Sequence, residues 1–447
     1  MATQRRGFSS NIGAILAAAG GAVGLGNVWR FPYMLGKNGG GAFLLVYIFF
    51  VFLIGIPIMM TEFVMGRSTQ SNVVGAYRKM GKKKAWIMLG VLTVIAAFLI
   101  YAYYSVVAGW TLNYIAFSIS GKLHGLDPSG VGQAFSDFTR GSFWPVVNQL
   151  VFLALTGFVI SFGVEKGIER VSKVLMPLLF ALLVIMCVRS LTLPGAVAGL
   201  EFLFRPDFSK ITGETLLSAL GQSFFSMSLG LGGMITYGSY IRKQDSLLKT
   251  SAWISVCDLM VAILSGIVIF PAVFSFGLNP AAGPELVYVV LPNVFNSMSG
   301  GVVFAAVFFV LLGIAALTST ISLLEIIVAV AVEEFNWKRR TSSVVITIAV
   351  FIVGVFCTLS FGPLRNFHIF GRTIFEFFDM VTASYILPIG ALAMCLLVGW
   401  GCPKDLIASE LSQGSRLKSG FIEAYFFIVR YVAPIGLAII LISGLVS

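Results

Sequence analysis

Residues 20–27 read Gly-Gly-Ala-Val-Gly-Leu-Gly-Asn and place four glycines inside an apolar run long enough to cross a membrane. Glycine in a helix interior costs about 1 kcal/mol relative to alanine, so the cluster predicts a helix that is interrupted near its middle. Taken alone, the cluster is better explained by close packing of two membrane helices, because such packing also selects small residues.

A second cluster in the other half of the chain changes this balance. Residues 226–233 read Ser-Met-Ser-Leu-Gly-Leu-Gly-Gly and also lie near the middle of an apolar run. The two runs occupy corresponding places in two predicted five-helix halves, 11–192 and 215–398, which begin on opposite sides of the membrane. Paired interrupted helices in inverted repeats are typical of the binding site of a secondary transporter.

The composition excludes a soluble globular protein. Of 447 residues, 58% are hydrophobic and only 11% are charged, which is far from the balance of soluble domains. Apolar runs that can span about 30 Å of hydrocarbon predict an all-α polytopic membrane protein, with one transporter domain over 1–447. We expect about 11 transmembrane helices, near 11–36, 42–67, 86–120, 143–162, 171–192, 215–239, 251–276, 303–332, 343–361, 374–398 and an extra helix at 421–446.

The distribution of Lys and Arg predicts the orientation of the chain. Twenty of these residues fall on one side of the predicted bundle and seven on the other. The richer side faces the cytoplasm, so we expect a cytoplasmic N-terminus and, with an odd number of spans, an extracytoplasmic C-terminus. The same asymmetry explains the net charge of +11, so no nucleic-acid partner is expected.

Catalytic and metal-cluster patterns are missing from the sequence. The five cysteines fall in or beside apolar runs, without metal spacing or a disulfide framework. His124 and His368 lie in predicted outer loops, and no nucleophile–base pair is seen. We therefore expect no enzymatic activity.

An interrupted helix frees backbone groups that cannot stay unpaired inside a membrane. Free carbonyls can bind a cation, and the amides of Leu25 and Gly26, at the start of the second half-helix, can bind a carboxylate. Glu62, in the second helix, could accept the remaining free amides of the first helix, since an unpaired buried carboxylate is costly. An equally good explanation is that Glu62 lies at the cytoplasmic end of its helix.

Four motifs resemble the neurotransmitter:sodium symporter family, and the resemblance covers about 1–440. The motifs are Gly24–Pro32, Asn38–Phe43, Gly55–Pro57 and Glu62–Arg67. The resemblance implies a LeuT-like 5+5 inverted repeat with broken helices 1 and 6. Eleven spans without a twelfth resemble a bacterial branch that handles aromatic and other hydrophobic amino acids, which implies a multi-pass protein of the bacterial inner membrane.

The resemblance implies a first sodium site made of the Ala22 carbonyl, the Asn27 side chain and the Ser226 hydroxyl, completed by the substrate carboxylate. Helix 7 would add a ligand, either Cys257 or its neighbour Asp258. A thiol is a poor ligand for a hard cation, so we favour Asp258. Relatives that depend on chloride bind an anion beside this sodium. A carboxylate can replace that anion, so chloride is not expected as a cofactor.

The resemblance also implies a second sodium site. Its ligands would be the carbonyls of Gly20, Val23 and Ala315 and the hydroxyls of Thr318 and Ser319. Positions 315, 318 and 319 share one face of helix 8, and all five ligands are oxygens. Interhelical hydrogen bonding alone would explain the two hydroxyls, but the family motif favours Na+.

The implied substrate is an amino acid whose carboxylate meets the Leu25 and Gly26 amides and the Tyr104 hydroxyl. The full set of implied substrate-binding residues is Gly21, Ala22, Val23, Leu25, Gly26, Ile100, Tyr104, Phe225, Ser226, Ser228, Leu231, Ser319, Ser322 and Leu323. The lining holds no carboxylate for a basic side chain. Gly24 stands where monoamine transporters carry an aspartate, which favours amino acids over biogenic amines.

The resemblance implies gates on both sides of the pocket. Arg30 would pair with Asp379 above the pocket, with Tyr104 and Phe225 forming a lid. On the cytoplasmic side Arg5 or Arg6 would pair with Glu333. A second inner latch would join two further residues, Tyr240 and Glu325.

The predicted function is sodium-coupled symport of neutral hydrophobic L-amino acids, with aromatic ones included, by alternating access. The predicted partners are this small-molecule substrate, sodium ions and the lipid bilayer, with no obligate protein partner. Two alternatives remain: a sodium symporter for glycine or other small neutral amino acids, and an amino-acid receptor that does not transport.

Overall fold

The computed structural model describes residues 7–81, 83–277, 286–296, 298–414 and 417–446. Over these residues the chain forms helices and no strand, because the two β-bridges, Gly40 to Pro206 and Ile369 to Arg372, are isolated pairs. The predicted all-α class is therefore confirmed. The predicted gate residues Arg5 and Arg6 lie outside the described residues.

The first half of the chain contains the first glycine cluster and ten α-helices among the described residues. They are α1 (Asn11–Ala22), α2 (Phe31–Lys37), α3 (Gly41–Phe50), α4 (Ile56–Thr69), α5 (Val73–Gly81), α6 (Lys84–Ile119), α7 (Pro128–Arg140), α8 (Phe143–Ser161), α9 (Arg170–Ser190) and α10 (Ala196–Phe204). Three π-helical segments extend them: η1 (Gly26–Arg30) before α2, η2 (Val51–Gly55) between α3 and α4, and η3 (Val164–Glu169) before α9.

The second half contains the second glycine cluster and the remaining helices of the described residues. They are α11 (Gly213–Ser226), α12 (Gly233–Gly238), α13 (Leu247–Ser275), α14 (Leu291–Asn296), α15 (Gly301–Glu334), α16 (Arg339–Leu359), α17 (Ile374–Met380), α18 (Leu387–Leu396), α19 (Lys404–Ser412), α20 (Ser419–Phe427) and α21 (Ala433–Val446). A 3-10 turn (Phe208–Lys210) precedes α11, and π-helical segments lie at Leu286–Val290, Val381–Ile386, Leu397–Gly401 and Ile428–Val432.

Nine continuous helical stretches of the described residues are long and apolar enough to cross a membrane. A tenth crossing is the bent pair α1 and Gly26–Lys37, which turns by 50° at its break. Residues 227–232 separate α11 from α12. The described residues thus hold nine or ten such crossings. The pair α11 and α12 is not among them, so the eleventh predicted span, 215–239, stays a prediction.

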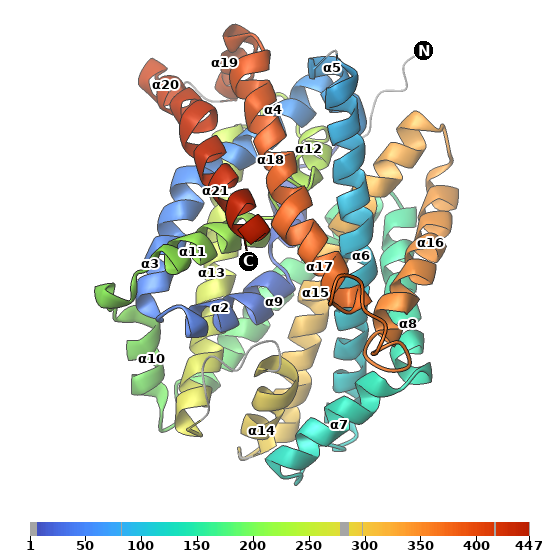
Figure 1. Ribbon diagram of the computed structural model, residues 1–447, viewed down its shortest axis with the longest axis vertical. Helices are drawn as coiled ribbons and strands as arrows, with labels where there is room; N and C mark the ends of the chain where they lie inside the picture. The colour runs from blue at the N-terminus through green and yellow to red at the C-terminus, as the bar shows by residue number, and fades with distance from the viewer. Residues whose placement is uncertain (1–6, 82, 278–285, 297, 415–416, 447) are drawn as a thin grey trace.

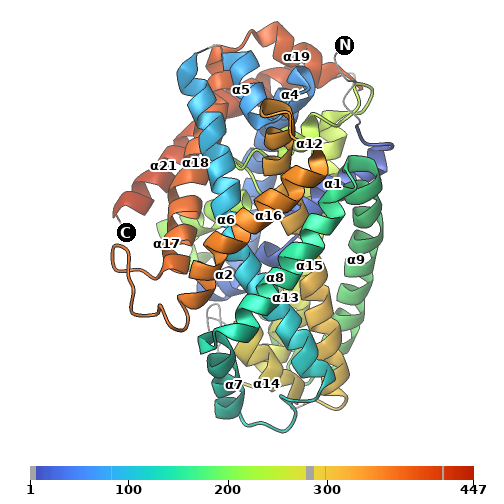
Figure 2. The same cartoon turned by 90° about the vertical axis from the view of Figure 1, so that its right-hand side faces the viewer.

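The helices form an elongated bundle with the two breaks near its centre (Figures 1 and 2). Helices α5, α19 and α20 lie at one end of the bundle, and α7 and α14 lie at the opposite end. The long helices α6 and α15 pack against each other, while α1 packs against α13 and α15. This packing surrounds both breaks with other helices, so their free backbone groups must find partners inside the protein.

Candidate functional site

The first helix is interrupted between Ala22 and Gly26. Helix α1 ends at Ala22, and Val23 has extended dihedral angles, with φ −75° and ψ 109°. A Cβ on Gly24 would lie 2.1 Å from Ser319 Oγ, so a side chain at this position would displace Ser319. The predicted interruption of helix 1 therefore lies where the sequence placed it.

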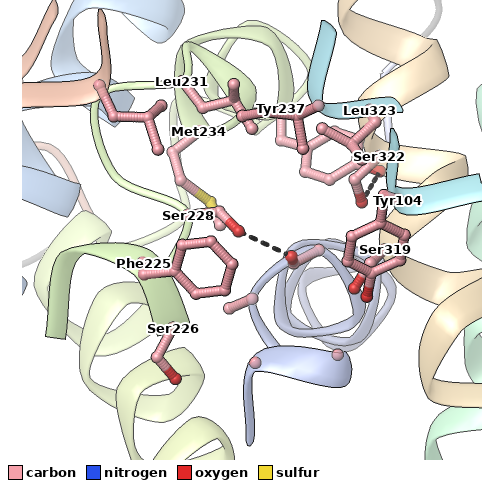
Figure 3. Close-up of a pocket in the computed structure, with 16 residues that line it drawn as sticks. Tyr104, Phe225, Ser226, Ser228, Leu231, Met234, Tyr237, Ser319, Ser322 and Leu323 are labelled. Atoms are coloured by element: carbon pink, nitrogen blue, oxygen red, sulfur yellow. Dashed lines mark hydrogen bonds between the residues drawn. The ribbon is translucent and has the colours of Figure 1, made fainter. Parts of the chain in front are cut away.

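The sixth helix is interrupted at residues 227–232. The chain adopts positive φ at Ser228 (53°), Gly230 (79°) and Gly232 (75°) before α12 begins. The hydroxyl of Ser228 donates to the carbonyl of Gly21 at 3.0 Å, so the two interrupted helices are hydrogen-bonded to each other (Figure 3).

Glu62 supports a helix break, but not the break that the sequence predicted. Its fully buried carboxylate accepts hydrogen bonds from the amides of Gly230 (2.7 Å), Met234 (3.1 Å) and Ile235 (3.3 Å). These amides belong to the break of helix 6, so the predicted support of helix 1 is wrong. The reason is packing, because α4 lies against α12 and a Cβ on Gly66 would be only 2.0 Å from the Ile235 carbonyl oxygen.

A first oxygen-rich cluster lies beside the break of helix 1. The Asp258 carboxylate accepts hydrogen bonds from Asn27 Nδ2 (2.7 Å), the Ser226 hydroxyl (2.8 Å) and the Tyr47 hydroxyl (2.9 Å). Asn27 Nδ2 also donates to Ser226 Oγ at 2.9 Å. Cys257 is half-buried, whereas Asp258 is fully buried in the cluster. The cluster thus joins three predicted residues, Asn27, Ser226 and Asp258, and adds Tyr47, which the sequence did not indicate. The Ala22 carbonyl stays a prediction.

A second oxygen-rich cluster lies between the first helix and α15. The Thr318 hydroxyl lies 3.4 Å from the Val23 carbonyl oxygen and 3.0 Å from that of Ala315. The Ser319 hydroxyl also lies 3.4 Å from the Val23 oxygen. Gly20 permits this approach, because a Cβ there would lie 3.2 Å from Thr318 Cβ. The five predicted residues of the second site therefore lie close together, and the role of the Gly20 carbonyl as a ligand stays a prediction.

An apolar pocket lies between the two breaks (Figure 3). Twelve predicted residues line it: Gly21, Ala22, Gly26, Ile100, Tyr104, Phe225, Ser226, Ser228, Leu231, Ser319, Ser322 and Leu323. Gly24, Met234, Tyr237 and Leu387 also line it, and the sequence reading did not assign them to the pocket. Met234 and Tyr237 are i and i+3 on α12 and so share a face, a signal that could have identified them, whereas nothing local singled out Leu387.

Tyr104 and Phe225 separate this pocket from a second cavity. Both residues, together with Gly26, line the central pocket and also the neighbouring cavity. Leu25 lines only the second cavity, and its amide donates to the Tyr104 hydroxyl oxygen at 3.0 Å. Tyr104 and Phe225 therefore occupy the place predicted for a lid.

The predicted outer gate residues face each other across that second cavity without an ion pair. Arg30 and Asp379 both line it, but no salt bridge joins them among the residues that the structure describes. The Arg30 guanidinium instead lies over the Phe225 ring, 4.0 Å from its centroid. The predicted pair is therefore not formed in this conformation.

At the opposite side of the pocket the predicted latch is closed. The Tyr240 hydroxyl donates to Glu325 Oε1 at 2.7 Å. Arg339, which the sequence analysis did not assign to a gate, binds both Glu325 oxygens and donates from Nε to the Ile160 carbonyl at 2.9 Å. Glu333 accepts a hydrogen bond from the backbone amide of residue 72 at 2.8 Å, and its predicted partner Arg5 lies outside the described residues.

Known proteins share both the sequence and the fold described above. Residues 5–126 and 140–447 match the Sodium:neurotransmitter symporter family. The chain belongs to this family. The symporter is 41% identical over 436 residues to the uncharacterized sodium-dependent transporter YhdH of Bacillus subtilis, covering 98% of this chain and 97% of the relative.

Two further similarities support the same conclusion. The symporter is 38% identical over 453 residues to an uncharacterized sodium-dependent transporter of Haemophilus influenzae, covering 99% of this chain and 98% of that one. The crystal structure of MhsT in complex with L-phenylalanine matches with a TM-score of 0.91 and 42% identity, covering 99% of this chain and 100% of MhsT. The symporter is therefore a multi-pass membrane protein of a sodium-dependent transporter family, with the LeuT-like fold that the sequence predicted.

Proposed function

We propose that this symporter couples inward movement of sodium to uptake of neutral hydrophobic L-amino acids, aromatic ones included. One observation carries the proposal: two oxygen-rich clusters flank the break of helix 1, and an apolar pocket lies beside them. A cation and an amino-acid carboxylate can satisfy the backbone groups of such a break. The L-phenylalanine bound to MhsT supports an aromatic substrate.

In this proposal the first sodium binds the Ala22 carbonyl, Asn27, Ser226 and Asp258. The Asp258 carboxylate brings a full negative charge to the cluster, so no chloride is needed beside the ion. The second sodium binds the second cluster, and its ligands are the five oxygens predicted from residues 20, 23, 315, 318 and 319. All these ligands are hard oxygen donors, as an alkali cation prefers.

The substrate carboxylate would meet the amides at the start of η1 and the hydroxyl of Tyr104. The Leu25 amide donates to that hydroxyl oxygen at 3.0 Å, so the two groups lie next to each other. The substrate side chain would extend towards Leu231 and Leu323, which line the pocket. An aspartate at position 24, as in an amine carrier, would require Ser319 to shift, because a Cβ there would lie 2.1 Å from Ser319 Oγ.

Coupling follows from shared ligands. Because the substrate carboxylate completes the first sodium site, sodium and substrate raise each other's affinity by the same factor. A membrane potential adds about 2.3 kcal/mol per charge per 100 mV. Alternating access would move the bundle of helices 1, 2, 6 and 7 against the rest of the protein. The two inverted repeats would be residues 11–192 and 215–398. The N-terminus would be cytoplasmic and the C-terminus outside.

The test is accumulation of radiolabelled L-phenylalanine in proteoliposomes with an inward sodium gradient. We expect uptake that potassium does not support and that is equal in chloride and gluconate. Binding without accumulation would favour a receptor. Accumulation of labelled glycine without accumulation of labelled phenylalanine would favour a carrier for small amino acids. Uptake that requires chloride would contradict the role of Asp258.

A further inference from the structure

The end of the substrate pocket nearest α12 carries two hydroxyl groups in an otherwise apolar lining. The hydroxyl oxygens of Tyr237 and Ser322 lie 2.8 Å apart, and both residues line the pocket (Figure 3). Leu231, Met234 and Leu323 form the apolar lining around them. A hydrogen-bonding pair in such surroundings can distinguish substrates that differ by one polar atom.

The hydrogen bonds of this pair fix which groups remain free. Ser322 Oγ lies 3.3 Å from the Thr318 carbonyl oxygen and can donate its proton there. Tyr237 then donates to Ser322 Oγ. The reverse arrangement would leave the Tyr237 proton without an acceptor among the described residues. With both protons used, each hydroxyl oxygen offers only lone pairs, so the pair accepts hydrogen bonds but has none left to donate.

A missing side chain keeps the Ser322 oxygen open to the pocket. A Cβ on Gly21 would lie 2.6 Å from Ser322 Oγ and 3.6 Å from Tyr237 Cε2. Any other residue at position 21 would therefore occupy the space beside the serine oxygen. Gly21 itself lines the pocket, so a substrate atom can approach the hydroxyl pair from this side.

We propose that Ser322 and Tyr237 form an acceptor site for a donor on the substrate side chain, and that the site selects tryptophan through its indole N–H. The proposal rests on the amino-acid symport proposed above and names the substrate that the pocket favours. An indole N–H is a donor only, which matches a site with acceptors only. Phenylalanine is not excluded, because the hydroxyl pair satisfies its own donors when no substrate donor is present.

The expected preference is modest, because a neutral hydrogen bond exchanges one partner for water. A net gain of this kind corresponds to about a threefold to tenfold change in affinity. The matched probe is 3-(3-benzothienyl)-L-alanine, in which sulfur replaces the indole N–H and the shape is nearly unchanged. The ratio of its Kd to that of tryptophan isolates the one hydrogen bond.

The experiment measures both dissociation constants in sodium for purified protein and for two variants, Ser322→Ala and Ser322→Cys, which keeps an atom at the γ position. The control is Thr320→Val. Thr320 lies on the same helix, but its hydroxyl pairs with that of Thr156 at 2.9 Å. We expect tryptophan to bind threefold to tenfold more tightly than the sulfur analogue in wild type and control, and the ratio to fall towards one in both Ser322 variants.

Two results would overturn the acceptor site: equal affinities in wild type, or an unchanged ratio in the Ser322 variants. L-Phenylalanine binding separates this failure from failure of the symport proposal. If phenylalanine binds in a sodium-dependent way while the tryptophan ratio does not change, the function stands and the acceptor site is wrong. If no amino acid binds in a sodium-dependent way, the proposed function itself fails.

Discussion

Glu62 is the residue whose replacement tests the architecture of the site most directly. Its two carboxylate oxygens accept hydrogen bonds from different backbone amides: Oε1 from Gly230, and Oε2 from Met234 and Ile235. The substitution Glu62→Gln keeps the size of the side chain but leaves one acceptor oxygen. The amide nitrogen then points two protons at backbone N–H groups that need an acceptor.

The cost follows from the number of bonds lost. Hydrogen bonds to a charged group contribute about 1.5–3 kcal/mol each, and the glutamine can keep only one of the two sets. We therefore expect Glu62→Gln to cost about 2–5 kcal/mol, for one or two bonds lost. At about 1–2 °C per kcal/mol for a large chain, this lowers Tm by about 2–10 °C.

The assay is thermal unfolding of purified protein, with sodium-dependent binding of L-phenylalanine as a second readout. Because the broken helix also lines the pocket, we expect the affinity to fall at least about tenfold. The control is Glu201→Gln, whose side chain is exposed on α10. If Glu62→Gln keeps both the wild-type Tm and the wild-type affinity, the carboxylate does not hold the break and the reasoning fails.

Three further substitutions test other parts of the structure. Asp258→Asn removes the charge from the first cluster, and we expect uptake in proteoliposomes to become stimulated by chloride; equal rates with and without chloride would refute this. Gly24→Ala places a methyl group 2.1 Å from Ser319 Oγ, so sodium-dependent phenylalanine binding should be lost, and retained binding would contradict the close approach. Arg67→Met leaves the Glu410 carboxylate buried without its ion pair, which should cost about 3–5 kcal/mol and lower Tm, whereas the double variant with Glu410→Leu should recover part of the loss.

The sequence predicted the parts of the site that depend on local backbone chemistry. Glycine clusters located both breaks, because several glycines inside a membrane helix need a special reason. Spacing of i, i+3 and i+4 placed Thr318 and Ser319 on one face of helix 8. The hardness of the expected cation favoured Asp258 over Cys257, and the structure places Asp258 in hydrogen-bonding contact with Asn27.

The contacts between distant helices were not predictable in the same way. The target of Glu62 depends on how closely α4 approaches α12, and that distance is set by small residues on both helices. Gly66 faces the Ile235 carbonyl, and a Cβ on Gly238 would lie 2.9 Å from Phe63 Cα. A single sequence contains these glycines but does not pair them.

Whether each gate is open or closed could also not be predicted from the sequence. Arg30 and Asp379 were correctly placed beside one cavity, yet whether they touch depends on the conformation and not on the residue types. Tyr240 and Glu325 are in contact at 2.7 Å, so one gate is closed while the other pair is apart. In the proposed alternating access, the same chain forms and breaks both contacts.

The contact between Glu62 and helix 6 has a consequence for how the protein would exchange its amide hydrogens. Unwound segments normally exchange quickly, because no helical hydrogen bond protects them. Here the amides of Gly230, Met234 and Ile235 are held by a side chain on another helix. The exchange rate of these amides therefore reports how often α4 and α12 separate. The exchange rate of a nearby helical amide reports only the local unwinding of its own helix.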